Sequence, residues 1–234
     1  MKIKDLNTWI KNQKKMNKML VSKINIKNII NWKIDNKKIY NKNKNFFSIV
    51  PFRFEVNKKS DWFQPLIIQN EVGILGILKK KYKALDYYLL QAKVEPGNIN
   101  NLQLAPTVQA TKSNYSRVHG GLKVPYLNHF LGIRNKNRFN QSEQGFRYYR
   151  KFNSNIIITT TKNIKKTPNH FWFDKRDIIS LLKKKNIINM DTLSVLSTSL
   201  SKKKIDLPIN ETTFIKKWIQ NFDKKFFIKT KIIK

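Results

Sequence analysis

Hydrophobic residues recur at three- and four-residue steps near the start of the chain, which predicts an amphipathic helix over residues 5–22. Valine and phenylalanine then alternate with other residues over 48–56, which predicts a strand. Pro51 lacks an N–H group, so this strand is expected to lie at a sheet edge there. Residues 23–47 are rich in Asn, Lys and Ile. They show neither helical spacing nor strand alternation, so no helix or strand is predicted there.

Four further apolar runs predict strands over residues 62–69, 72–78, 84–94 and 155–161. The lysine-rich segment 79–83 is expected to be an exposed hairpin turn. Three later segments have helical spacing, over residues 174–185, 191–200 and 211–222. Asp174 is a suitable N-cap for the first of these helices. Strands followed by helices predict an α+β fold with a mixed, mostly antiparallel sheet flanked by helices.

Residues 103–121 form a long stretch with little apolar pattern, rich in Thr, Ser, Asn and Tyr and poor in Lys. A polar stretch of this length in a compact domain is usually disordered or a binding loop. Because it holds few lysines, we interpret it as a binding loop. The preceding strand is expected to end at Glu95, directly before Pro96-Gly97.

The chain carries a formal charge of +34, from 41 Lys, 7 Arg and 14 acidic residues. This charge favours a nucleic-acid partner, but proteins that bind phosphates and bases use arginine in preference to lysine. Residues 61–160 carry only 14 of the 48 basic residues, so the charge avoids the most polar runs. We interpret it as dispersed, solvated lysine that gives no specific nucleic-acid binding; a true polyanion surface is the alternative.

Composition indicates in which cellular compartment the protein is expected to work. The chain has no cysteine, which excludes disulfides and thiolate sites and fits a cytoplasmic protein. No apolar run reaches the length of a membrane span, and residues 1–20 lack the apolar core of a secretory signal. No membrane association is therefore expected.

Several runs of this sequence are similar to the signature blocks of one enzyme family, the NDP-hexose 2,3-dehydratases. The runs are QPLIIQNEVGILGIL (64–78), LLQAKVEPGN (89–98), QLAPTVQATKSNYSRVHGG (103–121), QSEQGFRYYRKFN (141–153), NHFWF (169–173) and INMDTLSVLSTSL (188–200). We therefore expect one domain with an N-terminal helix and variable segment over 1–60, a dehydratase module over 61–200 and a C-terminal helical extension over 201–234.

The resemblance implies a fold and a reaction. The family is built on a Nudix-like α/β/α sandwich, although the Nudix box that holds magnesium is absent here. Its substrate is a nucleotide-linked sugar such as dTDP-4-keto-6-deoxyglucose, which loses water from carbons 2 and 3. The substrate's own ketone acidifies the C3 proton, so no metal or redox cofactor is expected. The unstable diketone product implies a downstream NADPH-dependent 3-ketoreductase. Family members carry two modules, so the resemblance implies a homodimer of this chain.

Such a reaction needs a base, an acid for the departing hydroxyl and a donor to the C4 oxyanion. Glu95 and Lys93 lie on one strand face and could be base and oxyanion donor, or a structural salt bridge. His119 suits proton transfer near neutral pH, or is a structural histidine. Tyr115 could donate to the enolate. Glu143 is a second candidate carboxylate.

The nucleotide sugar needs further contacts. For the diphosphate we expect arginines, because their planar forks make bidentate contacts; the candidates are Arg117, Arg147 and Arg150. The alternative for Arg147 is an ion pair with Glu143. For the thymine ring the candidates are Trp62, Gln64, Gln69 and Tyr148, and for sugar hydroxyls they are Gln109, Thr111 and Asn114. Two rival functions stay open: a non-catalytic nucleotide-sugar-binding module and a basic nucleic-acid-binding protein.

Overall fold

The computed structural model describes residues 3–42, 46–56, 60–115, 123–133 and 138–198. Contacts divide the chain into two units, Met1–Thr198 and Ser199–Lys234, and the described residues all belong to the first. The predicted helix over 211–222 and the extension over 201–234 lie outside the described residues.

Eleven strands are formed within these ranges. They are β1 (Trp32–Ile34), β2 (Ile39–Asn41), β3 (Ser48–Val56), β4 (Ser60–Ile68), β5 (Gly73–Tyr82), β6 (Leu85–Val94), β7 (Leu102–Pro106), β8 (Val108–Ala110), β9 (Phe139–Ser142), β10 (Phe152–Thr159) and β11 (His170–Asp174). The helices are α1 (Ile3–Met16), α2 (Lys112–Tyr115), α3 (Lys175–Leu182) and α4 (Met190–Thr198), with 3₁₀ turns η1 (Ile26–Asn28) and η2 (Leu127–His129).

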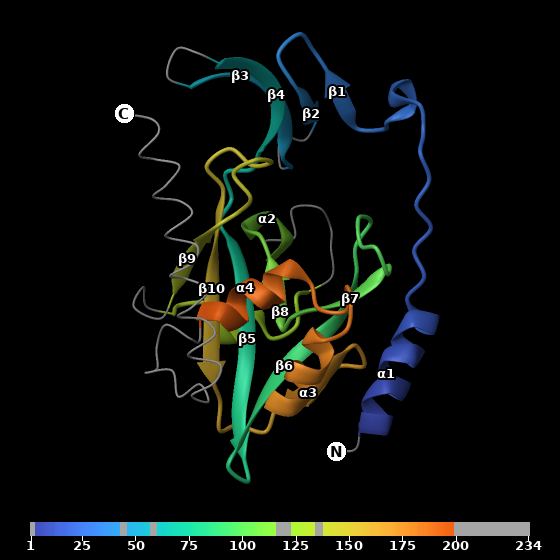
Figure 1. Cartoon of the computed structure of the whole chain (residues 1–234), viewed down its shortest axis with the longest axis vertical. Helices are drawn as coiled ribbons and strands as arrows, with labels where there is room; N and C mark the ends of the chain where they lie inside the picture. The colour runs from blue at the N-terminus through green and yellow to red at the C-terminus, as the bar shows by residue number, and fades with distance from the viewer. Residues whose placement is uncertain (1–2, 43–45, 57–59, 116–122, 134–137, 199–234) are drawn as a thin grey trace. The chain divides into compact units, whose positions relative to one another are not determined.

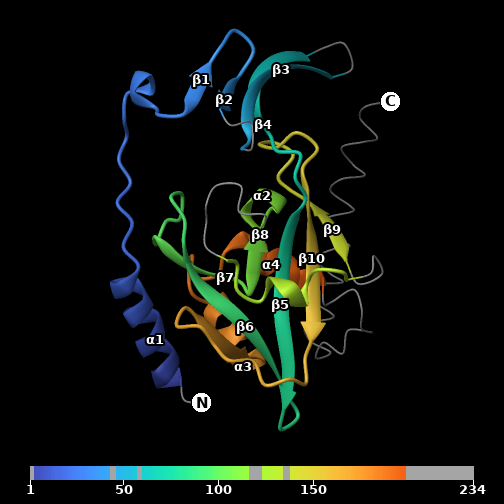
Figure 2. The same ribbon diagram turned by 180° about the vertical axis from the view of Figure 1, so that it is seen from behind.

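The strands form two sheets, which Figures 1 and 2 show from opposite sides. The smaller sheet has the order β1-β2-β3-β4, with antiparallel pairs throughout. The larger has the order β11-β6-β5-β10-β9, with β7 paired to β6 and β8 paired to β5. The β5–β10 pair is parallel and the other described pairs are antiparallel. The predicted α+β class with a mixed, mostly antiparallel sheet is therefore confirmed.

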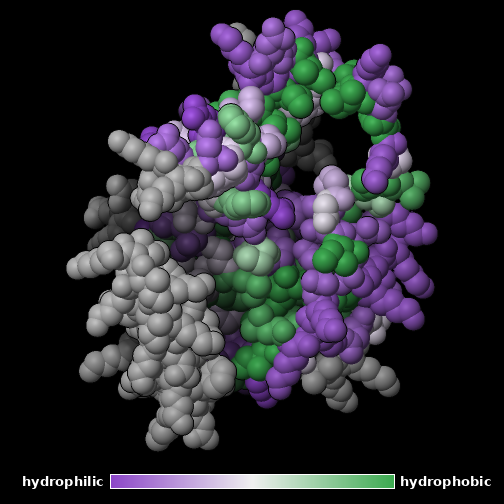
Figure 3. All heavy atoms as spheres, turned by 45° about the horizontal axis from the view of Figure 1, so that its top comes forward, coloured by the Kyte–Doolittle hydropathy of each residue, from purple (hydrophilic) through white to green (hydrophobic). Residues whose placement is uncertain are grey.

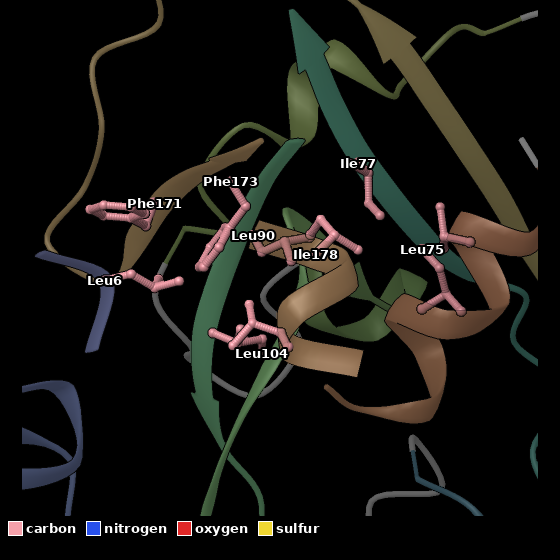
Figure 4. Packing of buried hydrophobic residues seen from close by; sticks show 10 residues of the cluster. Leu6, Leu75, Ile77, Leu90, Leu104, Phe171, Phe173 and Ile178 are labelled. Atoms are coloured by element: carbon pink, nitrogen blue, oxygen red, sulfur yellow. The ribbon is translucent and has the colours of Figure 1, made fainter. Parts of the chain in front are cut away.

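Alternation along the central strands produces two hydrophobic clusters, one on each face of the larger sheet. Leu75 and Ile77 of β5 pack with Phe173 of β11 and with residues of α1, α3 and α4 (Figure 4). Ile74 and Leu78 face the other way and pack with Phe130, Leu127 and Trp172. Among the described helices, α1, α3 and α4 thus contribute to one face, and η2 contributes to the other.

Strands β5 and β6 pair over only part of their length and then diverge. Their register ends at the Leu78–Leu89 pair, beyond which β6 pairs with β7 and β5 pairs with β8. Thr107, between β7 and β8, fills the point of divergence. Its hydroxyl accepts from the Leu78 N–H at 2.9 Å and donates to the Leu89 carbonyl. We call this arrangement the Thr107 junction.

Helix ends follow local capping chemistry. Helix α1 ends at Met16 rather than at residue 22. The Asn17 N–H makes a last helical bond to the Gln13 carbonyl, and the Asn17 side-chain amide also donates to that carbonyl. Leu20, which fits the helical spacing, is fully exposed. The prediction for Asp174 is confirmed: it caps α3 and forms a reciprocal capping box with Asp177.

Two sequence-based predictions are wrong. Residues 103–110 do not form a loop but the strands β7 and β8, because Leu102, Leu104 and Val108 point into the core while Gln103 and Gln109 stay partly exposed. The hairpin turn does not extend over 79–83, since β5 continues to Tyr82. The turn is formed by Lys83 and Ala84 alone, both with positive φ.

The edge position expected for Pro51 agrees with the register. Strand β2 pairs with β3 only at Ser48 and Ile49, so Pro51 faces β4 on one side alone. Strands β1, β2 and β9 were not predicted. They are only three or four residues long, and few of their side chains are buried, so alternation leaves little trace in the sequence.

The Thr107 junction generates a stability prediction. Thr107→Val keeps the side-chain shape but leaves the buried Leu78 N–H and Leu89 carbonyl without their partner. Leaving buried polar groups unpaired costs roughly 1–3 kcal/mol each, so the free energy of unfolding should fall by about 2 kcal/mol or more. Urea denaturation measures this. The control is Thr159→Val on the exposed end of β10, which should change stability little; equal effects of the two changes would contradict the role of the junction.

Candidate active site

A cavity of about 490 Å³ lies where β5 and β6 have diverged. Its wall includes nine of the residues predicted from the sequence: Lys93, Glu95, Gln69, Gln109, Thr111, Asn114, Glu143, Arg147 and Tyr148. We call it the main cavity. The divergence explains its position, because Lys93 of β6 and Gln109 of β8 border a common space beside Gly73 and Leu75 of β5.

Glu95 is the most closely held carboxylate of the main cavity. Its Oε1 atom accepts from Lys93 Nζ at 2.9 Å and from Gln109 Nε2 at 3.0 Å. Gln109 Oε1 in turn accepts from Asn189 Nδ2 at 3.2 Å. The Lys93–Glu95 pair is about a third exposed, so its ion pair alone contributes little stability.

Glu143 is fixed from the opposite wall. Its Oε1 accepts from Asn153 Nδ2 at 2.5 Å, and the side-chain oxygen of Asn153, Oδ1, accepts from the Gly73 N–H at 3.2 Å. A Cβ on Gly73 would lie 2.5 Å from that oxygen, so only glycine allows this contact. Within the described residues no ion pair joins Glu143 to Arg147. The structural alternative proposed for that pair is therefore wrong.

The site's wall beside β8 is held by Glu71. The Ser113 hydroxyl and N–H donate to its two carboxylate oxygens at 2.7 and 3.1 Å. Asn114 Oδ1 accepts from the Thr111 N–H and hydroxyl at 3.0 and 2.7 Å. These bonds fix the short helix α2 against the β4–β5 connection.

Several predicted residues lie elsewhere. Trp62 stacks on Phe54 with ring centroids 5.1 Å apart, and Gln64 donates to the Phe146 carbonyl at 2.5 Å; neither lines the main cavity. The Arg150 guanidinium lies over the exposed Tyr149 ring, also outside it. The backbone of Tyr115 ends α2, but its side chain, like the whole of Arg117 and His119, lies outside the described residues.

The structure adds residues that sequence reasoning missed. They are Asn98, Gln103, Gln144, Lys151, Asn153, Asn189 and Asp191, which also line the main cavity. Lys151 is nearly buried, with its Nζ donating to the Glu71 carbonyl. Burial lowers the pKa of Lys151 and raises that of the Tyr148 hydroxyl. Asp191 lies in the first turn of α4, in a segment whose helical spacing gives no local sign that it reaches the cavity.

Asp191 has the most perturbed carboxyl group of the cavity. Burial, followed by repulsion from Glu143 and Glu95, raises its pKa from 3.8 to about 6, against the attraction of Lys93 and Lys151. The cavity wall carries three acidic side chains (Glu95, Glu143, Asp191) and three basic ones (Lys93, Arg147, Lys151). This balance contrasts with the +34 charge of the whole chain and differs from a phosphate-binding groove for nucleic acid.

A mixed set of carboxylates, ammonium groups and amides can move protons and hold a developing oxyanion. Among the described residues no group of three or more His, Cys, Asp or Glu side chains is placed to hold a metal ion. None of the described helices is long and apolar enough to cross a membrane.

Comparison with known proteins agrees with this chemistry. The family model described as NDP-hexose 2,3-dehydratase matches residues 3–198, so the chain belongs to that family. A dTDP-4-dehydro-6-deoxy-α-D-glucopyranose 2,3-dehydratase of Saccharopolyspora spinosa is 38% identical over 201 residues, covering 82% of this chain and 41% of that protein. One of Streptomyces violaceoruber is 38% identical over 187 residues, covering 74% and 42%.

A third relative with the same name, from Amycolatopsis orientalis, is 42% identical over 140 residues, covering 58% of this chain and 30% of that protein. The chain thus spans less than half the length of the curated relatives it matches.

The perturbed carboxyl generates the second prediction. Because Glu143 is the strongest repulsive neighbour of Asp191, Glu143→Gln should lower the pKa of Asp191 below about 6. Carbon-13 NMR titration of labelled aspartate carboxyls measures this. Glu55→Gln, an exposed change on β3, is the matched control and should leave that pKa where it is.

The same pKa predicts a pH-dependent stability. The Asp191 carboxyl binds its proton more tightly in the folded state, with a pKa of about 6 against 3.8. The folded wild type should therefore lose stability relative to Asp191→Asn as pH rises from about 4 to about 6, by at most about 3 kcal/mol. A stability difference that is independent of pH would contradict the raised pKa.

Proposed function

We propose that the chain is an NDP-hexose 2,3-dehydratase that removes water from dTDP-4-keto-6-deoxyglucose to give a 3,4-diketo-2,6-dideoxy sugar. The observation that carries the proposal is the main cavity, whose wall brings acidic, basic and amide side chains together around a space that can hold the reacting sugar. In this cavity a carboxylate and an ammonium group lie 2.9 Å apart beside two more carboxylates. The substrate is the compound in the relatives' names.

In the proposed reaction Glu95 removes the C3 proton, and the electrons move onto the C4 oxygen as an enolate. Lys93, near the end of β6 and two residues before Glu95, donates to that oxyanion. Its ammonium group already contacts the base, so it stabilises charge on either partner. The enolate then expels the C2 hydroxyl, and the resulting enol tautomerises to the diketone. The substrate's own ketone accepts the electron pair of the broken C3–H bond. We therefore predict that the reaction needs no metal ion and no cofactor.

For the nucleotide we propose Arg147 as the diphosphate ligand. It lines the main cavity, and its side chain has no ion-pair partner among the described residues. Tyr148 and Gln69 line the main cavity together with Arg147. Backbone hydrogen bonds between Ile67 and residues 147 and 149 hold the two segments side by side. Tyr148 and Gln69 are our candidates for the thymine ring. Arg117 and His119 lie outside the described residues, and their proposed roles remain predictions.

The rival functions fit less well. A nucleic-acid-binding surface would concentrate basic residues at the polar cavity, whereas its wall is balanced in charge. A non-catalytic nucleotide-sugar-binding module would not need three carboxylates in one cavity, of which one has a pKa near neutrality. Within the proposed function, a Nudix-like architecture for residues 61–200 and a ketoreductase that consumes the product are further proposals.

The fourth prediction tests the function directly. The protein should convert dTDP-4-keto-6-deoxyglucose to a diketone, measured by mass spectrometry after trapping or after coupling to a ketoreductase and NADPH. Glu95→Gln should lower turnover roughly a hundred- to ten-thousand-fold with little change in dTDP affinity, because proton removal acts in the transition state. Arg147→Ala should mainly weaken dTDP binding.

Calorimetric titration with dTDP provides the affinity measurement for both variants. Lys162→Ala, an exposed change outside the cavity, is the control for loss of positive charge. If wild type binds dTDP tightly and never turns over the 4-keto sugar, the binding-module alternative is correct.

We also propose that two copies of the chain associate through the smaller sheet. Strand β4 ends that sheet, and its neighbouring residues Trp62 and Phe63 are 41% and 75% exposed. Exposed aromatic residues that gather on an edge strand are typical of an interface. In the space-filling view, hydrophobic residues come to the surface over this part of the molecule (Figure 3).

The fifth prediction follows from this surface. Light scattering should give about twice the chain mass of 27.8 kDa for wild type. Phe63→Asp should shift the protein to the monomer mass, because a buried unpaired charge would oppose association. Ile99→Asp, at another residue that is 77% exposed, is the matched control and should leave the dimer intact. A monomeric wild type would refute the proposal.

A further inference from the structure

Asp191 lies at a junction between two spaces. It lines the main cavity and also an adjoining side cavity of about 400 Å³, which is walled by residues of β9, β10 and α4. The two cavities share Leu75, Glu143, Gln144, Asn153, Met190 and Asp191. The carboxyl group therefore stands at the boundary of the main cavity, beside the carboxylates of the proposed site.

The position of Asp191 is fixed by the start of helix α4. Asn189 Oδ1 accepts from the Thr192 N–H at 2.9 Å and so caps the helix. The Asn189 amide also donates to Gln109, whose own amide donates to the proposed base Glu95. The Thr192 hydroxyl and the Asn189 N–H both bind the Leu104 carbonyl of β7, each at 3.0 Å. Asp191 is thus held by the same network as Glu95.

The three carboxyl groups of the cavity differ in their partners. Glu95 accepts from two donors, and Glu143 accepts from the Asn153 amide. The Asp191 carboxyl has no hydrogen-bond or ion-pair partner among the described residues. A carboxyl group without donors, close to two other carboxylates, favours its protonated form.

We propose that Asp191 is the general acid that protonates the C2 hydroxyl as it leaves, an inference that rests on the proposed dehydratase function. In this step the C3–H bond breaks and its proton passes to Glu95. The electron pair forms the enolate and then the C2–C3 double bond as the C2–O bond breaks. Asp191 supplies the proton that turns the departing hydroxyl into water. The enzyme ends with Glu95 protonated and Asp191 ionised, and exchange with solvent restores both.

The surroundings of Asp191 suit this role. The charged and titratable groups that face it are Glu143 directly after β9, Glu95 directly after β6, Lys93 on β6, Lys151 before β10, and Tyr148. Burial is the largest cause of its raised pKa, and the two glutamates add to it. An acid whose pKa lies near the working pH combines a populated protonated form with effective proton transfer.

The first experiment compares Asp191→Asn with wild type in deuterated water. The variant should lose roughly a hundred- to ten-thousand-fold in dehydration. It should still exchange the C3 proton of recovered substrate, because the base and the oxyanion donor remain. Its dTDP affinity should be unchanged. Asp61→Asn, which removes an exposed carboxylate paired with Arg53, is the matched control and should dehydrate normally.

The second experiment replaces the leaving group. Fluoride is a much weaker base than hydroxide and departs without a full proton transfer. With the 2-deoxy-2-fluoro analogue of the 4-keto substrate, Asp191→Asn should release fluoride within about tenfold of the wild-type rate. A fluoride electrode gives this readout independently of diketone detection. Rescue by the better leaving group separates an acid from a residue that only supports the fold.

The outcomes distinguish the inference from the function beneath it. If wild type neither dehydrates the sugar nor exchanges C3, the proposed function fails. If wild type is active and Asp191→Asn is equally active, the role of Asp191 is overturned. Loss of both dehydration and exchange with dTDP binding retained would also overturn it, since Asp191 would then act before the elimination.

If Asp191→Asn does not fold, a measurement on the wild type alone still tests the inference. Dehydration of the hydroxyl substrate should decline as pH rises above about 6, the pKa of Asp191. Fluoride release from the analogue should not decline in that range. Parallel pH profiles for the two substrates would overturn the inference.

Discussion

The Thr107 hydroxyl is the contact on which the site depends. It bonds to the backbones of Leu78 and Leu89 at the last residues where β5 and β6 still pair. Beyond it the two strands separate without leaving their polar groups unpaired, because β7 and β8 take up the free edges. Without such an insertion, two neighbouring strands would simply continue their ladder and leave no space between them. His170 holds the Thr107 carbonyl from β11, so the larger sheet supports the junction from a third strand.

The carboxyl groups of the main cavity repel one another, and the packing of the surrounding elements holds them in place. Three carboxyl groups share one space, and the fold raises the pKa of Asp191 rather than giving that group a donor. Such an arrangement costs stability near neutral pH, and it persists because α4 is anchored to β7 and β8 through Asn189 and Thr192. Groups with displaced pKa values and fixed positions are typical of sites that transfer protons. The cost therefore fits a catalytic role better than a purely structural one.

Much of the fold could be predicted from the sequence because its signals are local. The alternation over β3 to β6 and the capping chemistry of Asp174 depend only on neighbouring residues. The wrong interpretation of residues 103–110 has a physical reason. Gln103, Thr107 and Gln109 are polar because they serve the junction and the cavity, and a strand that contributes to a site has a weaker hydrophobic pattern than one that only packs.

The sequence by itself determined the family's motifs, the order of most elements and the pairing of Lys93 with Glu95, which lie two residues apart at the end of one strand and directly after it. Only the tertiary structure decided which distant groups meet them. It brings Glu143 and Asp191 to Glu95, and it places Trp62, Gln64 and Arg150 away from the main cavity. The reason is that spacing along a chain fixes the face of an element, whereas the divergence of two strands and the docking of α4 fix which faces enclose a common space.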